Sequence, residues 1–319
     1  MKDSYLKLLC ERTNKKNCII VYSGTLAIES ALFMLKIKKN DAVLVASSVC
    51  NSIINAIIRV GAVPIIVEPK NRFTFSYDDI KDVIYKENIK CMIMVHQYGL
   101  GQDIKTIKES FPNIPIIEDI AQAWDIHIKR QKIGEYSDIV ITSFGKTKPL
   151  SYGHGGAILS NLEINNYIDF YDNDSRNNKK NMLPYYLTDS YNINFKKLIK
   201  KADTIVKYQR KIAQKLTFLN DYHFITVVLE EENNYVWHRY PVIVDNENFK
   251  VFINILDKCK VKYQLPHPIE LKDLPFLENK TFKYINKNDR DDKKIIFIRT
   301  RGNKIRNIKK LQNKMKGIM

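Results

Sequence analysis

Cysteine is scarce in this sequence, with five copies in 319 residues, and no two of them form a Cys-x-x-Cys pair. The copies are spread over the whole chain, at Cys10, Cys18, Cys50, Cys91 and Cys259. Zinc sites and disulfide frameworks depend on cysteines at short, regular spacings. We therefore expect no metal site, and we interpret most of these thiols as reduced residues of the core.

Two kinds of segment are also missing. No stretch approaches the roughly 20 apolar residues that span a bilayer, and the N-terminal residues Met1 to Ser4 lack the apolar core of a signal peptide. We therefore expect a cytoplasmic protein without a membrane span. Gly145-Lys146-Thr147 resembles the end of a P-loop but lacks a glycine five residues earlier, which argues against nucleoside triphosphate binding.

Acidic residues are the minority charge, since 35 Asp and Glu against 52 Lys and Arg give a formal net charge of +17. A basic surface can bind nucleic acid backbones without sequence preference. The basic residues, however, are spread along the chain and do not form one block with interleaved aromatics. We therefore expect no dedicated nucleic-acid partner, although a positive field would attract an anionic small molecule or an anionic membrane surface.

Short apolar runs alternate with helical patterns through much of the chain, which predicts a mostly parallel sheet with right-handed crossovers and helices on both faces. We expect a large domain over residues 1–194, then a long helix and a smaller α+β domain over residues 195–319. The expected strands are 18–21, 42–46, 63–67, 91–95, 114–117, 139–142, 157–159, 235–244, 261–265 and 295–298. The expected helices are 1–12, 26–37, 53–60, 77–87, 104–110, 195–219, 249–258 and 305–316.

The segment from Ser137 to Ser160 organises the chain. Its apolar run 139–142 is typical of a buried strand, and a loop carrying Lys148 follows. A glycine-dense turn, Gly153 to Gly156, then lets the backbone approach a ligand closely. A lysine amine becomes a nucleophile when it is partly desolvated or crowded by other cations. On this segment alone, a chance loop lysine in a lysine-rich chain is the simpler interpretation.

The carboxylates Glu118 and Asp119 end the previous buried run, and they favour a functional role for Lys148 over a chance loop lysine. Ligands collect at the carboxyl ends of strands in an open α/β sheet, so Asp119 and Lys148 can face one crevice. The pairing suits pyridoxal phosphate, whose aldehyde forms a Schiff base with a lysine and whose ring nitrogen is kept protonated by an aspartate. Ser23-Gly24-Thr25 precedes a helical pattern, and a helix N-terminus favours a phosphate.

At these residues the sequence resembles the DegT/DnrJ/EryC1/StrS aminotransferases, fold-type I pyridoxal-phosphate enzymes that act mostly on nucleotide-linked keto sugars. The resemblance covers residues 18–159 well and the rest loosely. It implies a large, mostly parallel sheet domain with a smaller C-terminal α+β domain. Its blocks are Ser23-Gly24-Thr25 with Ala27, Gly61-Ala62-Val63-Pro64, His96-Gln97-Tyr98-Gly99, Glu118-Asp119 with Ala121-Gln122-Ala123, and Asp138 with Ser143-Phe144, Lys148 and Gly155-Gly156.

Carried over position by position, the resemblance implies a role for each matching residue. Lys148 would be the catalytic lysine that binds the cofactor and moves protons, and Asp119 would be the partner of the ring nitrogen. Gln122 would contact the ring hydroxyl. The other cofactor-binding positions that it implies are Ser23, Gly24, Thr25 and Ser143 at the phosphate, with Cys50 and His96 beside the ring.

Several positions depart from the family pattern. Cys50 stands where an aromatic residue usually stacks on the cofactor ring, and His154 replaces a glutamate in the glycine turn. The family also has an asparagine that reaches the partner subunit, and a basic residue close to it in sequence. Pro184 stands at the asparagine position here, and Tyr186 at the basic one. Fewer residues than usual precede the first block. The cofactor set is mostly intact, whereas the substrate and dimer-bridging set is eroded. His96 is nearly as well explained as a hydrogen-bonded structural histidine.

The sequence therefore predicts a homodimeric aminotransferase that moves an amino group from glutamate to a nucleotide-linked keto sugar, for amino-sugar or surface-polysaccharide biosynthesis. Two alternatives stay open. One is a pyridoxal-phosphate dehydratase, although retention of Lys148 disfavours the branch in which histidine replaces that lysine. The other is a degenerate, non-catalytic family member. His267 could reach the substrate from the small domain, but a turn histidine is the simpler interpretation.

Overall fold

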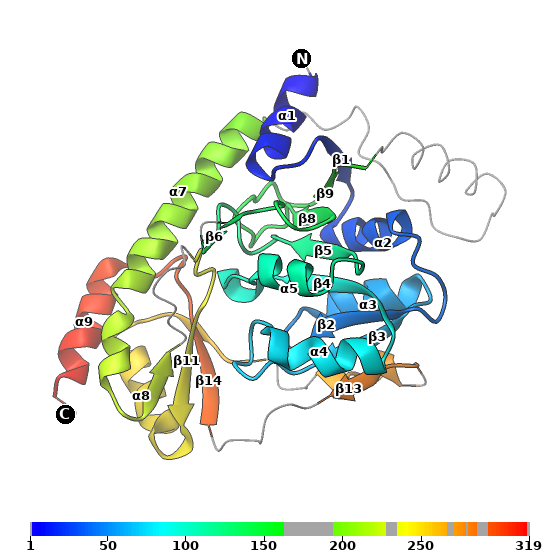
Figure 1. Ribbon diagram of the computed structural model, residues 1–319. Helices are drawn as coiled ribbons and strands as arrows, with labels where there is room; N and C mark the ends of the chain where they lie inside the picture. The colour runs from blue at the N-terminus through cyan, green and yellow to red at the C-terminus, as the bar shows by residue number, and fades with distance from the viewer. Residues whose placement is uncertain are drawn as a thin grey trace.

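The computed structural model describes residues 2–129, 131–162, 194–227, 235–266, 271–278, 280–285 and 293–317. Within these ranges the chain folds into an eight-stranded sheet flanked by helices and a separate four-stranded sheet with its own helices (Figure 1). This architecture confirms the expected α/β class with a large, mostly parallel sheet and a smaller C-terminal α+β part.

The large sheet has the strand order β1-β9-β8-β5-β4-β2-β3-β13, and β9 alone runs opposite to its neighbours. Its strands are rich in Ile and Val, which suits strands buried on both faces. They are β1 (Asn17–Val21), β2 (Ala42–Ala46), β3 (Val63–Val67), β4 (Ile89–Val95), β5 (Ile116–Asp119), β8 (Ile139–Ser143), β9 (Gly156–Ser160) and β13 (Lys283–Ile285).

Helices cover both faces of this sheet. Strand order and right-handed crossovers place α2 and α3 on one face and α4 and α5 on the other, and α2 packs on α3 as α4 packs on α5. Helix α4 begins with a capping box between Ser76 and Asp79. The bounds are α1 (Lys2–Arg12), α2 (Gly24–Met34), α3 (Asn51–Arg59), α4 (Tyr77–Lys86) and α5 (Ile104–Ser110). The short turn η1 (Gln97–Gly99) follows β4, and β6 (His127–Ile128) pairs with β7 (Gln131–Lys132).

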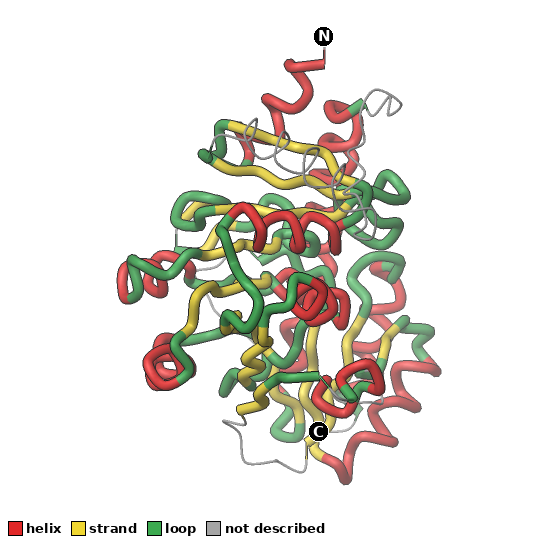
Figure 2. The backbone as a smooth tube through the Cα atoms, turned by 90° about the vertical axis from the view of Figure 1, so that its right-hand side faces the viewer, coloured by secondary structure: helices red, strands yellow, loops and turns green. Residues whose placement is uncertain are grey.

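The smaller sheet is antiparallel, with the order β10-β11-β14-β12. Helix α7 (Phe195–Gln214) runs from beside α1 down to this sheet (Figure 1). Figure 2 shows the strands of the molecule in yellow, in a view turned by 90°. An apolar stripe on α7, including Leu198 and Val206, packs into the core. The remaining elements are η2 (Thr217–Asp221), β10 (Ile225–Val227), β11 (Tyr240–Asp245), α8 (Asn246–Lys258), β12 (Tyr263–Gln264), η3 (Leu271–Asp273), η4 (Pro275–Leu277), β14 (Lys293–Ile298) and α9 (Ile305–Met315).

Most expected elements appear within a few residues of their observed bounds, with three differences. The strand expected at 235–244 begins only at Tyr240, because residues 235–239 pack against η1. The long helix ends at Gln214 and continues into η2. The short strands β10 and β13 were not expected, since three residues carry too little periodicity. Because β13 pairs with β3 of the large sheet, the division at residue 194 stays a prediction.

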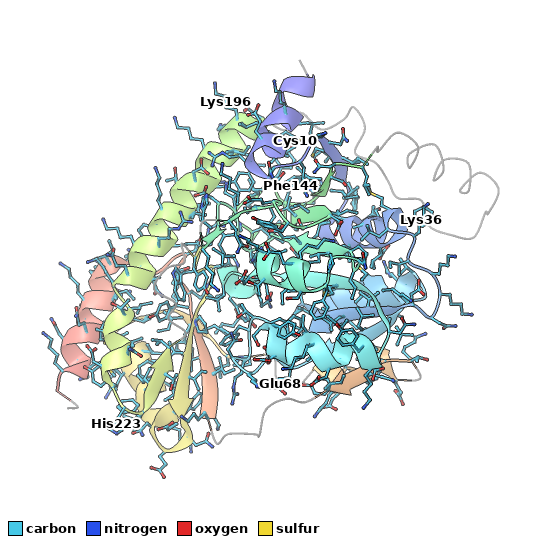
Figure 3. All side chains as sticks on the ribbon, in the orientation of Figure 1. Cys10, Lys36, Glu68, Phe144, Lys196 and His223 are labelled. Carbon is cyan, nitrogen blue, oxygen red and sulfur yellow. The ribbon has the colours of Figure 1, made fainter. Side chains whose placement is uncertain are left out.

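Charged side chains spread over the outside of the molecule. Figure 3 shows Lys36 and Lys196 projecting from well-separated parts of the surface, whereas Phe144 lies inside. None of the described helices is long and apolar enough to cross a membrane. Among the described residues there is also no group of three or more His, Cys, Asp or Glu side chains placed to hold a metal ion.

Candidate active site

The predicted site residues converge on one edge of the large sheet. Strands β1, β2, β4, β5 and β8 are parallel to one another, so their carboxyl ends meet at this edge, where β9 begins. The residues at or just after these ends are Ser23 and Gly24 for β1, Cys50 for β2, His96 for β4, Asp119 and Gln122 for β5, and Ser143 and Lys148 for β8. The structure thus gathers, from five strands, residues that lie far apart in sequence.

The N-terminus of α2 is held against the end of β8. Ser23 caps the helix, its hydroxyl oxygen accepting the Leu26 N–H at 3.1 Å. Gly24 lies so close to Ser143 that an added Cβ would be 2.8 Å from the Ser143 Cβ and 3.2 Å from its Oγ. The first amides of a helix have no acceptor inside it and attract an anion. A serine hydroxyl and a helix N-terminus therefore share one small space.

Asp119 is a buried carboxylate, and one of its two oxygens accepts a hydrogen bond within the protein. Its side chain is only 6% exposed, and Oδ1 accepts the Ala121 N–H at 2.8 Å. Burial raises the pKa of Asp119, while the Ala121 hydrogen bond and the positive charge of Lys148 lower it. No partner for Oδ2 occurs among the described residues. A cation donating to that oxygen would stabilise the ionised form.

Gln122 belongs to a short amide chain. Its Nε2 donates to the Gln97 Oε1 at 2.9 Å, and the Gln97 Nε2 donates to the Ser48 carbonyl at 2.6 Å. The chain fixes Gln122 and leaves its Oε1 as an acceptor. Cys50 is exposed at the start of α3, and its side chain makes no capping hydrogen bond.

Lys148 lies on the loop between β8 and β9 and is half-buried. Its N–H donates to the Gly145 carbonyl at 3.0 Å, and its carbonyl accepts from the Arg301 Nη1 at 3.3 Å. Behind it, the Phe144 carbonyl accepts the N–H groups of Tyr152 and Gly153, at 2.9 and 2.8 Å. The loop backbone is therefore pinned on both sides. The charge of Lys148 acts on Asp119, which places the amine and the carboxylate in one site.

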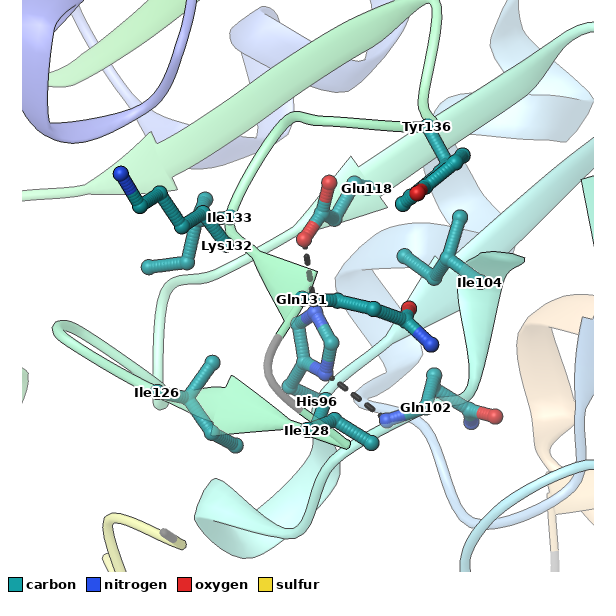
Figure 4. Close-up of a pocket in the computed structure, with 10 residues that line it drawn as sticks. All are labelled: His96, Gln102, Ile104, Glu118, Ile126, Ile128, Gln131, Lys132, Ile133 and Tyr136. Carbon is teal, nitrogen blue, oxygen red and sulfur yellow. Dashed lines mark hydrogen bonds and ion pairs between the residues drawn. The ribbon is translucent and has the colours of Figure 1, made fainter. Parts of the chain in front are cut away.

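His96 uses both ring nitrogens within the protein (Figure 4). Its Nδ1 accepts the Gln102 N–H at 3.0 Å, so the proton sits on Nε2, which donates to the Glu118 Oε1 at 3.0 Å. The side chain is 1% exposed and borders a small cavity between this network and the β6–β7 hairpin. These contacts favour the structural interpretation of His96, and a cofactor contact through its ring stays a prediction.

The Glu118 carboxylate is the centre of this buried network. Its Oε2 also accepts the Gly134 N–H at 2.9 Å and the Ser137 hydroxyl at 2.7 Å. We expect Glu118→Ala to leave three buried donors unsatisfied and to lower the free energy of unfolding by about 3 kcal/mol. Urea unfolding measures this change. The exposed Glu109→Ala variant should shift stability by no more than about 0.5 kcal/mol, and equal losses in the two variants would contradict the network's role.

Sequence reasoning missed a cluster of four residues that reaches Lys148 through His238 and Arg301. They are His238, Arg239, Arg299 and Arg301, from the segments before β11 and after β14. The signal was present, because Arg299 and Arg301 directly follow the apolar run of β14 at alternating positions. It was hidden in a generally basic C-terminal stretch. Pro184, Tyr186 and His267 lie outside the described residues.

The chain is also similar to known proteins. The family model of the DegT/DnrJ/EryC1/StrS aminotransferases matches residues 2–289. A GDP-perosamine synthase of Vibrio cholerae is 26% identical over 73% of this chain and 66% of its own length. A GDP-perosamine synthase of Escherichia coli O157:H7 is 32% identical over 47% of this chain and 42% of its own length. The aligned regions therefore span less than two thirds of these relatives.

The fold is shared with solved structures. One is NtdA of Bacillus subtilis with bound cofactor PMP, with a TM-score of 0.72, 21% sequence identity, and coverage of 98% of this chain and 77% of that one. At this level of identity the similarity establishes the fold. The chemistry of the site has to be argued from its own residues.

Proposed function

Since this chain belongs to the DegT/DnrJ/EryC1/StrS aminotransferase family, we propose that it is a pyridoxal-phosphate-dependent aminotransferase whose acceptor is a nucleotide-linked keto sugar. The observation that carries the proposal is the half-buried Lys148 within electrostatic reach of the buried Asp119, at the edge where a helix N-terminus meets Ser143. An amine, a carboxylate and an anion site are the three features that the cofactor requires.

The residues of the site fit the chemical groups of the cofactor. The open Oδ2 of Asp119 would accept from the protonated ring nitrogen, which would offset the cost of burying that carboxylate. Lys148 would hold the aldehyde carbon. The first amides of α2, at Gly24 and Thr25, and the Ser143 hydroxyl would hold the phosphate. When bound, the cofactor supplies an electron sink for the carbon that loses or gains a proton.

The protein's own groups would then perform three tasks. The free amine of Lys148 would take the proton from the donor's α-carbon and return a proton at the acceptor carbon, a general base and acid role. Asp119 would keep its charge and hold a cation at Oδ2 throughout. The pinned Lys148 backbone would restrict where the amine can reach, which supplies orientation.

The relatives support the proposed substrate class. Two of them are GDP-perosamine synthases, so we propose a nucleotide-linked keto sugar as acceptor and a role in amino-sugar or surface-polysaccharide biosynthesis. Glutamate as donor, the homodimer and a cytoplasmic location remain predictions. Retention of Lys148 disfavours the dehydratase branch in which histidine replaces that lysine. The non-catalytic alternative rests on Cys50 and on positions outside the described residues.

Amino transfer can be assayed in the reverse direction. The protein with pyridoxal phosphate, 2-oxoglutarate and GDP-perosamine should form L-glutamate, because amino transfer is reversible. A panel of other nucleotide-linked amino sugars would extend the test to other acceptors. Cofactor binding without glutamate formation from any member would argue against the substrate class, and absence of cofactor binding would argue for the non-catalytic alternative.

The phosphate position can be tested through Gly24. In Gly24→Ala the new methyl group would displace Ser143 from the helix N-terminus, because the added Cβ would be 2.8 Å from the Ser143 Cβ. We expect the affinity for pyridoxal phosphate to fall about tenfold, the effect of losing one charge-assisted hydrogen bond. Titration followed by absorbance measures it. Gly317→Ala, whose nearest neighbour would lie at 3.7 Å, should bind like wild type, and unchanged binding in Gly24→Ala would move the phosphate elsewhere.

A further inference from the structure

Three arginines gather around His238, and one of them, Arg301, contacts the Lys148 carbonyl. Arg239 precedes β11, and Arg299 and Arg301 follow β14. Burial lowers the pKa of the Arg239 guanidinium, and the positive charges of Arg299 and Arg301 lower it further. Among the described residues, none of the three forms an ion pair with a carboxylate. Such crowding of like charges is costly in the free protein.

The backbone holds this arginine cluster in place. The Arg239 N–H donates to the Tyr98 carbonyl at 3.1 Å, which ties it to the turn after β4. The Thr300 hydroxyl, between the two other arginines, is fully buried and donates to the carbonyls of Trp237 and His238. A Cβ on Gly99 would lie only 2.7 Å from the His238 amide nitrogen. The segments before β11 and after β14 are therefore packed tightly onto the large sheet's active edge.

His238 adds an unsatisfied buried donor to the same cluster. Its side chain is 4% exposed, and Nδ1 has no hydrogen-bond partner in the part of the chain that the structure describes. Arg239 Nη1 lies 3.4 Å from Nε2 and can only donate, so Nε2 accepts and Nδ1 carries the proton. Burial lowers the pKa of His238, as do the charges of Arg239, Lys148, Arg301 and Arg299. A neutral histidine with an unused N–H thus sits among four cations.

We propose that Arg239, Arg299 and Arg301, with the Nδ1–H of His238, form the site that receives an oxyanion of the substrate. Guanidinium groups bind carboxylate and phosphate through paired hydrogen bonds. The 3.3 Å contact between the Arg301 Nη1 and the Lys148 carbonyl places this site next to the reacting amine. An anion there would neutralise the crowded charges and satisfy the buried histidine.

The inference rests on the proposed function and deepens it, because the site is separate from the phosphate position at Gly24 and Ser143. Two substrate groups share the required chemistry, namely the diphosphate of a nucleotide sugar and a carboxylate of the amino donor. Inorganic pyrophosphate and glutarate are probes that distinguish them. Either anion would be held by residues of one chain.

The experiment is calorimetric titration of each probe into the full-length protein in the presence of saturating pyridoxal phosphate, which occupies the cofactor phosphate position. In the double variant with Arg299→Gln and Arg301→Gln we expect the affinity for at least one probe to fall tenfold or more. Loss for pyrophosphate alone assigns the diphosphate, and loss for glutarate alone assigns the donor carboxylate. Arg306→Gln, an exposed arginine of α9, should stay within twofold of wild type.

Unchanged affinity for both probes would overturn the proposal, as would equal losses in the Arg306→Gln control. Cofactor absorbance in the double variant gives a second readout, which should match wild type. Loss of cofactor binding with unchanged probe affinity would assign the arginines to the cofactor and also overturn the proposal. If wild type binds no cofactor, the proposed function fails, but the same titrations still decide whether the arginine cluster binds anions.

Discussion

The Lys148→Ala variant should lose amino transfer by a factor on the order of 10⁴ or more, because one amine both holds the cofactor and moves the protons. The backbone of the loop is fixed by the Gly145 and Arg301 contacts, which involve no side-chain atom of Lys148. Folding should therefore survive the truncation. Steady-state assays of glutamate formation, with circular dichroism of the same samples, measure the two properties separately.

Lys146 provides the matched control for this variant. It lies two residues away on the same loop and is exposed. Lys146→Ala should keep activity within a few-fold of wild type, since a solvated lysine contributes little to a neighbouring site. If both variants were equally active, Lys148 would not be the catalytic amine. If both were inactive and unfolded, the loop and not the amine would explain the loss.

The Asp119→Asn variant should lower kcat by about 10²-fold or more, the scale of losing one preorganised electrostatic contact. The amide keeps the shape of the side chain but cannot balance a protonated ring nitrogen. Burial raises the pKa of Asp119 in the free protein, and a cation bound at Oδ2 should lower that pKa again. Pyridoxal phosphate should therefore raise the thermal midpoint of wild type more than that of Asp119→Asn.

Asp78→Asn serves as the control, because Asp78 is an exposed residue whose carboxylate contacts Lys81. It should respond to the cofactor as wild type does. Equal stabilisation of wild type and Asp119→Asn by the cofactor, with equal kcat, would show that the buried carboxylate has no contact with the ring. The proposed orientation of the cofactor would then be wrong.

The parallel sheet could be predicted because its signal is local. Runs such as 42–46 and 139–142 are continuous and β-branched, and each is followed by glycine or polar residues at the carboxyl end. The position of Asp119 and Lys148 at one edge follows from parallel pairing. Parallel pairing thus accounts for Asp119 and Lys148, whereas Gln122, Ser143, Cys50 and His96 were implied only by the family resemblance.

The arginine cluster could not be predicted in the same way. In the sequence, Arg239 lies 60 residues before Arg299. The two arginines meet only because β14 pairs with β11, next to the segment that carries Arg239. Burial of His238 with an unused Nδ1 is likewise a property of packing. The hydrogen bonds of His96 to Gln102 and Glu118 could not be predicted for a related reason, because they are tertiary contacts.

The visible absorption spectrum of the purified protein with added pyridoxal phosphate, before and after L-glutamate, tests the central claim most directly. The account predicts a cofactor band that requires Lys148, is absent in Lys148→Ala, and is bleached by glutamate. A band of equal strength in Lys148→Ala, or no band in wild type, would contradict the assignment of this site as an aminotransferase centre.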